Sequence, residues 1–172
     1  MWFKKNNKMK KNVLAIIPAR ANSKGIINKN IQLINGKPLI QLTIEFVKSL
    51  KFVDKIVVST DSKKIIDIAN KFAVTTVLRP AKLATDQSKV EDAISHVIKN
   101  FDKNFNYDYI LLFEPTSPLR TTKTVNECFK ILTSTTHFSV FTVSRSNKFF
   151  GYVSNSKFYP LIKSQKRRRQ DR

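Results

Sequence analysis

Three cationic side chains, Arg20, Lys24 and Lys29, lie in one short stretch that follows a run of apolar residues. Small residues and Gly25 separate them, so the backbone can approach a ligand closely and Gly25 can adopt a positive φ. Backbone amides and cations together neutralise phosphate oxygens, and the stretch therefore predicts a phosphate-binding loop. Its spacing matches neither G-x-G-x-x-G nor G-x-x-x-x-G-K-[ST], so neither a dinucleotide-binding fingerprint nor a P-loop is supported.

Polar loops also follow the other apolar runs, and each has an ordinary structural interpretation. Asp61 is typical of the start of a helix, and the segment that ends at Asp86 is typical of a helix cap. Arg79 stands where a strand ends before a proline. Residues 114–120, Glu-Pro-Thr-Ser-Pro-Leu-Arg, are typical of a stiff turn. Taken one at a time, none of these loops identifies a function.

Regular elements must position these loops, and the hydrophobic pattern predicts them. Short apolar runs indicate buried strands, and apolar residues at helical spacing indicate helices between them. Pro38 suits a first helical position, and Ser62 suits a helix cap. The predicted strands are Val13–Ile17, Lys55–Thr60, Val74–Leu78, Tyr109–Phe113 and Phe138–Val143. The predicted helices run from Leu39 to Leu50, from Ile65 to Phe72, from Val90 to Phe101 and from Val125 to Leu132.

The alternation of strands and helices predicts an α/β fold with a mostly parallel sheet and helices on both faces. In such sheets, ligands bind at the carboxyl ends of the strands. Every polar loop named above follows a predicted strand. The loops are therefore expected to meet at a single site.

The composition limits the class of protein. A chain of 172 residues can form one domain with its own core, and the single cysteine, Cys128, excludes an internal disulfide framework. The formal net charge of +20 is compatible with polyanion binding, but the lysines are spread along the chain, which favours a Lys-rich surface. The apolar run after the basic N-terminus is too short for a secretory signal, and no stretch is long enough for a membrane span. We therefore expect a cytoplasmic protein without a membrane partner.

Taken together and in order, the loops resemble one family, the acylneuraminate cytidylyltransferases or CMP-sialic acid synthetases. The matching segments are IIPARANSKGIINKNI, GKPLI, VVSTD, LRPAKLATD and EPTSPLRT, over roughly residues 12–145, and KRRRQD near the end resembles a further family segment. Several ordered motifs form a far more specific match than any single one. The resemblance implies a three-layer α/β/α fold of the nucleotide-diphospho-sugar transferase type. Residues 1–11 would be a basic extension, and 12–172 the N-terminal part of the family domain.

The resemblance also implies a reaction. A hydroxyl on the anomeric carbon of a sialic acid or related nonulosonic acid attacks the α-phosphate of CTP, giving a CMP-sugar and pyrophosphate. The implied nucleotide-binding residues are Arg20, Ser23, Lys24, Lys29, Asn30, Arg79, Glu114, Thr116 and Ser117. Of these, Arg20 and Lys29 are the implied catalytic residues, because this chemistry needs mainly positioning and charge neutralisation. We identify no general base.

The sequence departs from the family pattern in three places. Glu114 replaces a usual glutamine, which leaves the sugar acid open, and Lys89 and Val90 replace a frequent pair of serines near the cytidine. The family also continues beyond the position of Arg172, with the aspartate pair that binds Mg²⁺, the sugar-carboxylate contacts and much of the homodimer interface. We therefore expect Mg²⁺ as the family cofactor, name no metal ligand, and expect a shortened chain with reduced activity.

Two alternatives stay open at this point. A non-catalytic protein that binds nucleic acid or another polyanion would use the net charge and the basic segment 163–172. An enzyme like the 3-deoxy-manno-octulosonate cytidylyltransferases would use CTP with a different sugar acid. The Ala-Asn-Ser-Lys-Gly form of the first loop favours the sialate side.

Overall fold

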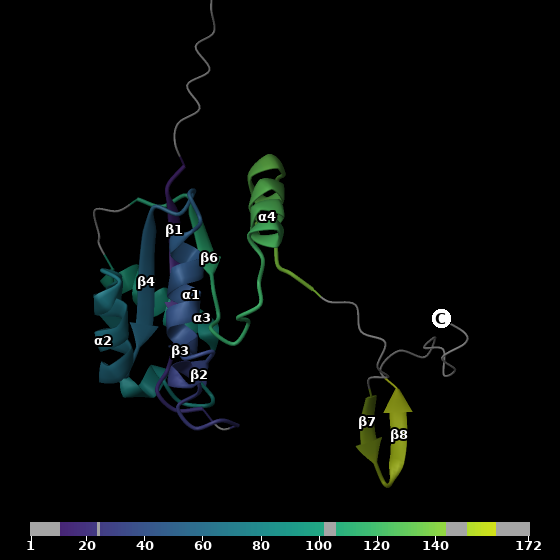
Figure 1. Ribbon diagram of the computed structural model, residues 1–172. Coiled ribbons are helices and arrows are strands. Elements are labelled where there is room, and N and C mark those ends of the chain that lie inside the picture. Colours follow the sequence, from purple (N-terminus) through teal and green to yellow (C-terminus); the bar gives the residue numbers. More distant parts are fainter. Residues whose placement is uncertain (1–10, 24, 102–105, 144–150, 161–172) are drawn as a thin grey trace, which may run out of the picture. The chain divides into compact units, whose positions relative to one another are not determined.

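The computed structural model describes residues 11–23, 25–101, 106–143 and 151–160 (Figure 1). The chain divides into two compact units, Met1–Thr122 and Lys123–Arg172, and each is described by itself. The prediction of one domain over 12–172 stays a prediction.

A four-stranded parallel sheet forms the centre of the first unit. Its spatial order is β5-β4-β1-β6, and the pairs β1–β4, β1–β6 and β4–β5 are all parallel. The strands are β1 (Val13–Pro18), β4 (Lys55–Thr60), β5 (Thr75–Leu78) and β6 (Tyr109–Leu112). The first four predicted strands and the parallel arrangement are therefore confirmed.

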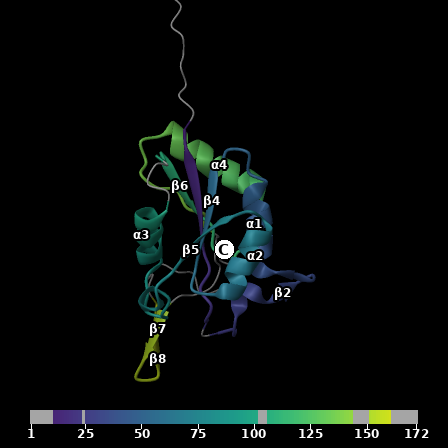
Figure 2. The same cartoon turned by 90° about the vertical axis from the view of Figure 1, so that its left-hand side faces the viewer.

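Helices cover both faces of this sheet. Figure 2 shows α1 (Leu39–Lys48) and α2 (Lys63–Lys71) on one side and α3 (Val90–Asn100) on the other. Leu14 and Ile16 of β1 belong to the same buried cluster as Val97 of α3. Because helices cover both faces, alternate side chains of β1 are buried on either side, and Val13–Ile17 reads as an unbroken apolar run.

Two predicted helix starts differ in detail. Pro38 ends the short strand β3 (Lys37–Pro38) and precedes α1 as its N-cap, because it also pairs with β2 (Leu33–Ile34) in a hairpin. The two hairpin loop residues, Asn35 and Gly36, both have positive φ, as a tight two-residue turn requires. Ser62 is the N-cap of α2, but its side chain makes no capping hydrogen bond.

The strand order creates a topological switch point. The chain moves outward from β1 through β4 to β5 and then crosses back to place β6 on the other side of β1. The strand order therefore reverses beside β1, where residues of the loops that leave β1 and β6 border one opening at the carboxyl edge. Such an opening is where doubly wound sheets bind ligands.

The second unit contains most of α4 (Thr122–Ser134) and an antiparallel hairpin of β7 (Gly151–Ser154) and β8 (Lys157–Pro160). The predicted strand Phe138–Val143 is wrong, because this segment has no regular secondary structure. A strand needs a neighbouring backbone, and no described strand pairs with the segment. No helix in the described parts of the chain is long and apolar enough to cross a membrane.

Candidate functional site

A cavity of about 170 Å³ lies where the loops after the parallel strands meet. Four segments line it: the loop and short helical turn after β1, Arg79 after β5, residues between 83 and 90, and the loop after β6. All four belong to the first unit. The predicted convergence is therefore observed for the loops after β1, β5 and β6, whereas the loop after β4, which contains Asp61, is not among the lining segments.

Most of the residues singled out from the sequence line this one cavity. They are Arg20, Ser23, Lys29, Asn30, Arg79, Glu114 and Thr116. Ser117 is exposed and is not among the lining residues, although its backbone N–H donates to the Glu114 carbonyl. Lys24 lies outside the described residues.

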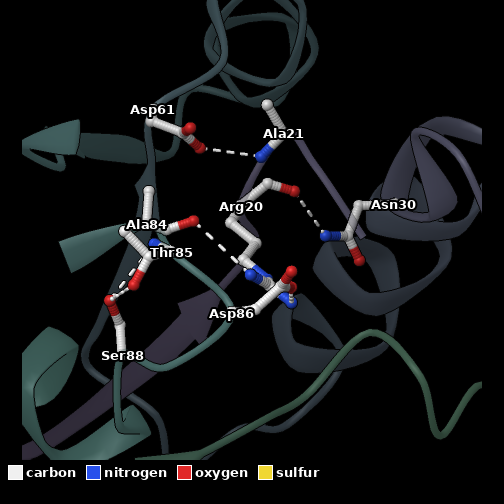
Figure 3. A network of polar contacts seen from close by, with 8 residues as sticks. All are labelled: Arg20, Ala21, Asn30, Asp61, Ala84, Thr85, Asp86 and Ser88. Carbon is white, nitrogen blue, oxygen red and sulfur yellow. Dashed lines mark hydrogen bonds and ion pairs between the residues drawn. The ribbon is translucent and has the colours of Figure 1, made fainter. Parts of the chain in front are cut away.

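The Arg20 side chain reaches across the site (Figure 3). Its Nη2 forms an ion pair with Asp86 Oδ1 at 2.6 Å, and its Nη1 donates to the Ala84 carbonyl at 3.5 Å. The buried Asn30, in the 3-10 turn η1 (Lys29–Ile31), donates from Nδ2 to the Arg20 carbonyl at 2.9 Å. Asn30 therefore fixes the backbone from which the guanidinium extends.

Asp61, which directly follows β4, contacts the candidate phosphate-binding loop after β1 (Figure 3). Its Oδ1 accepts the backbone N–H of Ala21 at 2.7 Å. The sequence suggested a helix start at Asp61, and its contact with a residue 40 positions away was missed. An acidic residue directly after the strand adjacent to β1 was the available signal.

If the loop holds the phosphates of CTP, as the sequence resemblance implies, Asp61→Ala is expected to weaken CTP binding about tenfold, because the loop loses a charge-assisted hydrogen bond that fixes its backbone. Isothermal titration calorimetry measures this change. Asp61→Asn keeps an oxygen acceptor and should lose less, and Asp67→Ala, at an exposed position on α2, removes the same charge as a control. Equal affinities for Asp61→Ala and Asp67→Ala would contradict this role.

Arg79 is the buried cation of the site, with 7% of its surface exposed. Its Nε donates to Ser59 Oγ at 3.1 Å and its Nη2 to the Ser59 carbonyl at 2.9 Å. Burial lowers the pKa of Arg79, the Asp61 carboxylate raises it, and Arg20 lowers it again. Arg79 thus ties the ends of β4 and β5 together beside the cavity.

The segment between η2 (Ala81–Leu83) and α3 forms another wall. The hydroxyls of Thr85 and Ser88 lie 2.8 Å apart, and Ser88 Oγ also donates to the Lys82 carbonyl at 3.1 Å. Thr85, Ser88 and Lys89 all line the cavity. The sequence did not identify Ser88, because its partners are local and resemble an ordinary turn.

Arg120 closes the loop that follows β6. It donates from Nη2 to the Glu114 carbonyl, and its guanidinium lies 5.6 Å from the ring centroid of Phe46 and 5.5 Å from that of Phe113. Burial lowers the pKa of Arg120, and Glu114 opposes this shift. The loop is therefore folded back on itself, which places Glu114 and Thr116 at the cavity.

The cavity is suited to an anionic ligand. Arg20, Lys29, Arg79 and Lys89 line it, against one acidic residue, Glu114, in its described lining. A concave site lined by cations raises the local concentration of anions. Guanidinium groups bind phosphate through paired hydrogen bonds. A molecule with several phosphates fits this charge distribution.

A sequence-family profile described as "Cytidylyltransferase" matches residues 14–164. The chain belongs to the cytidylyltransferase family. The match includes every segment that lines the cavity, so these loops are those of a cytidylyltransferase.

Curated relatives of this chain are named for N-acylneuraminic, diacetyllegionaminic and pseudaminic acids. The N-acylneuraminate cytidylyltransferase of Escherichia coli is 36% identical over 141 residues, covering 81% of this chain and 33% of that protein. The CMP-N,N'-diacetyllegionaminic acid synthase of Legionella pneumophila is 40% identical over 121 residues, covering 69% and 52%. The pseudaminic acid cytidylyltransferase of Campylobacter jejuni is 37% identical over 108 residues, covering 62% and 47%. The chain thus spans one third to about half of each relative.

Solved structures of cytidylyltransferases share the fold of this chain. A 2-C-methyl-D-erythritol 4-phosphate cytidylyltransferase from Francisella tularensis has a TM-score of 0.69 at 16% identity, covering 90% of this chain and 68% of that one. A CMP:2-keto-3-deoxy-manno-octonic acid synthetase, complexed with CTP, has a TM-score of 0.62 at 19% identity, covering 72% and 48%. At these identities the likeness concerns the fold.

The described residues of this cytidylyltransferase do not form a dedicated metal site. No group of three or more His, Cys, Asp or Glu side chains in that part of the chain is placed to hold a metal ion. The Asp86 carboxylate is paired with Arg20, and Glu114 lies on the opposite loop. These residues therefore do not fit the ligand set that a hard divalent cation prefers.

Proposed function

We propose that this chain is the nucleotide-binding part of a CMP-nonulosonate synthetase, which uses CTP and a sialic, legionaminic or related acid. The observation that carries the proposal is the convergence of Arg20, Lys29 and Arg79 in one cavity at the switch point of the sheet. The relatives named for these sugar acids support the substrate class. CTP is a cytoplasmic metabolite, so we place the reaction in the cytoplasm.

In the proposed reaction, the anomeric hydroxyl oxygen of the sugar acid forms a bond to the α-phosphorus of CTP. The bond from that phosphorus to the oxygen bridging to the β-phosphate breaks, pyrophosphate leaves, and the hydroxyl proton passes to solvent. Arg20 and Lys29 act as the catalytic residues by neutralising phosphate charge, and Ser23, Lys24 and Asn30 complete the loop that holds the phosphates.

The remaining walls hold the other parts of the substrates. Arg79 contacts the nucleotide, and Glu114 and Thr116 form the nucleotide and sugar side of the site, to which Ser117 of the same loop, outside the cavity lining, is also assigned. Glu114 carries a carboxylate on the side of the site assigned to the sugar acid. Its negative charge would influence which sugar acid the site accepts. Mg²⁺, the family cofactor that we expect, receives no ligand among the described residues, and no step is assigned to it.

The test is pyrophosphate release by the purified chain with CTP, Mg²⁺ and a panel of acids: N-acetylneuraminate, diacetyllegionaminate, pseudaminate and 3-deoxy-manno-octulosonate. We expect release that requires both CTP and a nonulosonic acid, with ATP and GTP inactive. Calorimetry with the same nucleotides measures binding separately. Selective CTP binding without release would support the nucleotide site and contradict the transferase reaction for this chain, and release only with 3-deoxy-manno-octulosonate would overturn the sugar class.

A further inference from the structure

Both terminal nitrogens of Arg20 already have acceptors within the chain. Nη2 contacts Asp86 Oδ1 at 2.6 Å, and Nη1 contacts the Ala84 carbonyl at 3.5 Å (Figure 3). Phosphate binds a guanidinium best through two parallel N–H···O bonds. Arg20 has five N–H groups, and a phosphate that binds through the two used here replaces one or both of these acceptors.

Asp86 is placed to compete rather than to assist. Its carboxylate has the same charge sign as a phosphate and contacts Nη2, one of the nitrogens through which a guanidinium binds phosphate. The side chains of Arg20 and Asp86 are 28% and 34% exposed, so solvent screens the ion pair only in part. Breaking this ion pair to admit a phosphate therefore costs a moderate free energy. A carboxylate left beside a bound triphosphate would be repelled by it.

The backbone around Asp86 can stay in place while its side chain exchanges. Thr85 N–H donates to Ser88 Oγ at 3.1 Å, and Ser88 N–H donates to the Thr85 carbonyl at 3.3 Å. This turn fixes the residue before Asp86 independently of the ion pair. Rotation of the Asp86 side chain can therefore separate its carboxylate from Arg20 Nη2 without a change in this turn.

We propose that Asp86 is an internal counter-ion that competes with the phosphates of the nucleotide for Arg20. It gives up the guanidinium when the triphosphate enters and takes it back when pyrophosphate leaves. Asp86 thereby lowers the affinity of the site for polyphosphates and favours product release. The inference rests on the proposed function for the identity of the ligand, and on the Arg20–Asp86 contact for the competition.

Inorganic tripolyphosphate tests the competition without a nucleoside. By calorimetry, Asp86→Asn should bind tripolyphosphate and pyrophosphate about five- to tenfold more tightly than the unaltered chain, because the competing charge is gone. Asp86→Ala should show the same gain in affinity. It also removes the hydrogen bond to Arg20 that an asparagine side chain could still make. Cytidine, which lacks phosphate, should bind all three proteins equally.

Two controls separate this role from a general effect of charge. Asp67→Asn makes the same change of net charge at an exposed position of α2 and should bind tripolyphosphate as the unaltered chain does. In an Arg20→Ala background, Asp86→Asn should give no gain, because the contested cation is missing.

The outcomes are distinguishable. Weaker or unchanged tripolyphosphate binding by both Asp86 variants, a gain that persists without Arg20, or no binding by any variant would overturn the counter-ion role. A gain with tripolyphosphate but no preference for CTP over ATP would support the counter-ion role and contradict the proposed function.

Discussion

Arg20→Ala is expected to weaken CTP binding by about a hundredfold, because the site loses the guanidinium that can bind a phosphate through two charge-assisted hydrogen bonds. Asn30 and Asp61 both fix the peptide unit that follows the Arg20 Cα, at the Arg20 carbonyl and the Ala21 N–H. The lost side chain therefore leaves a preorganised loop without its principal cation. Calorimetric titration with CTP measures the loss directly.

A matched set of variants shows whether the loss belongs to the guanidinium. Arg20→Lys keeps the charge but not the fork of donors, and should recover part of the affinity. Lys64→Ala removes a positive charge from an exposed position on α2 and should leave CTP binding within about twofold of the unaltered chain. CTP affinity in Arg20→Ala equal to that in Lys64→Ala would remove Arg20 from the phosphate site.

The sheet was predictable because its strands are buried on both faces. Val13–Ile17 is apolar throughout, and the structure buries it between helices on either side. The same reasoning failed for Phe138–Val143, whose apolar residues resemble a strand. Phe138 and Val143 are exposed, and no described strand pairs with their segment. Apolar composition indicates that a segment can be buried, but only a partner strand satisfies its backbone.

The cations of the site were predictable, and their acidic partners were not. Arg20 and Lys29 lie in the segment that follows one predicted strand, and Arg79 directly follows another, so the rule that ligands bind at strand ends brings them together. Asp61 and Asp86 also lie in loops that follow predicted strands. Each, however, is explained locally as a residue at the start of a helix. Their contacts with Ala21 and Arg20 join distant parts of the sequence and depend on the order of the strands.

Arg79→Leu is expected to lower the free energy of unfolding by about 2–4 kcal/mol, since it removes the donors of a buried polar cluster. Leucine fills part of the space but leaves Ser59 Oγ without the Arg79 Nε donor, and leaves Asp61 without its nearby buried cation. Urea denaturation measures the change. An unchanged m-value would show that the surface exposed on unfolding is the same, so that the shift of the midpoint measures the loss of stability.

Two further variants divide this loss between hydrogen bonding and charge. Ser59→Ala removes the bond to Oγ while the Arg79 guanidinium still donates to the Ser59 carbonyl, so it should cost about 1 kcal/mol. Arg79→Lys keeps a cation opposite Asp61 with fewer donors, and should fall between Ser59→Ala and Arg79→Leu. If Arg79→Leu were as stable as the unaltered chain yet bound CTP poorly, Arg79 would serve the ligand alone. Loss of stability and affinity together would mean that the cation joining β4 to β5 also builds the wall on which the nucleotide rests.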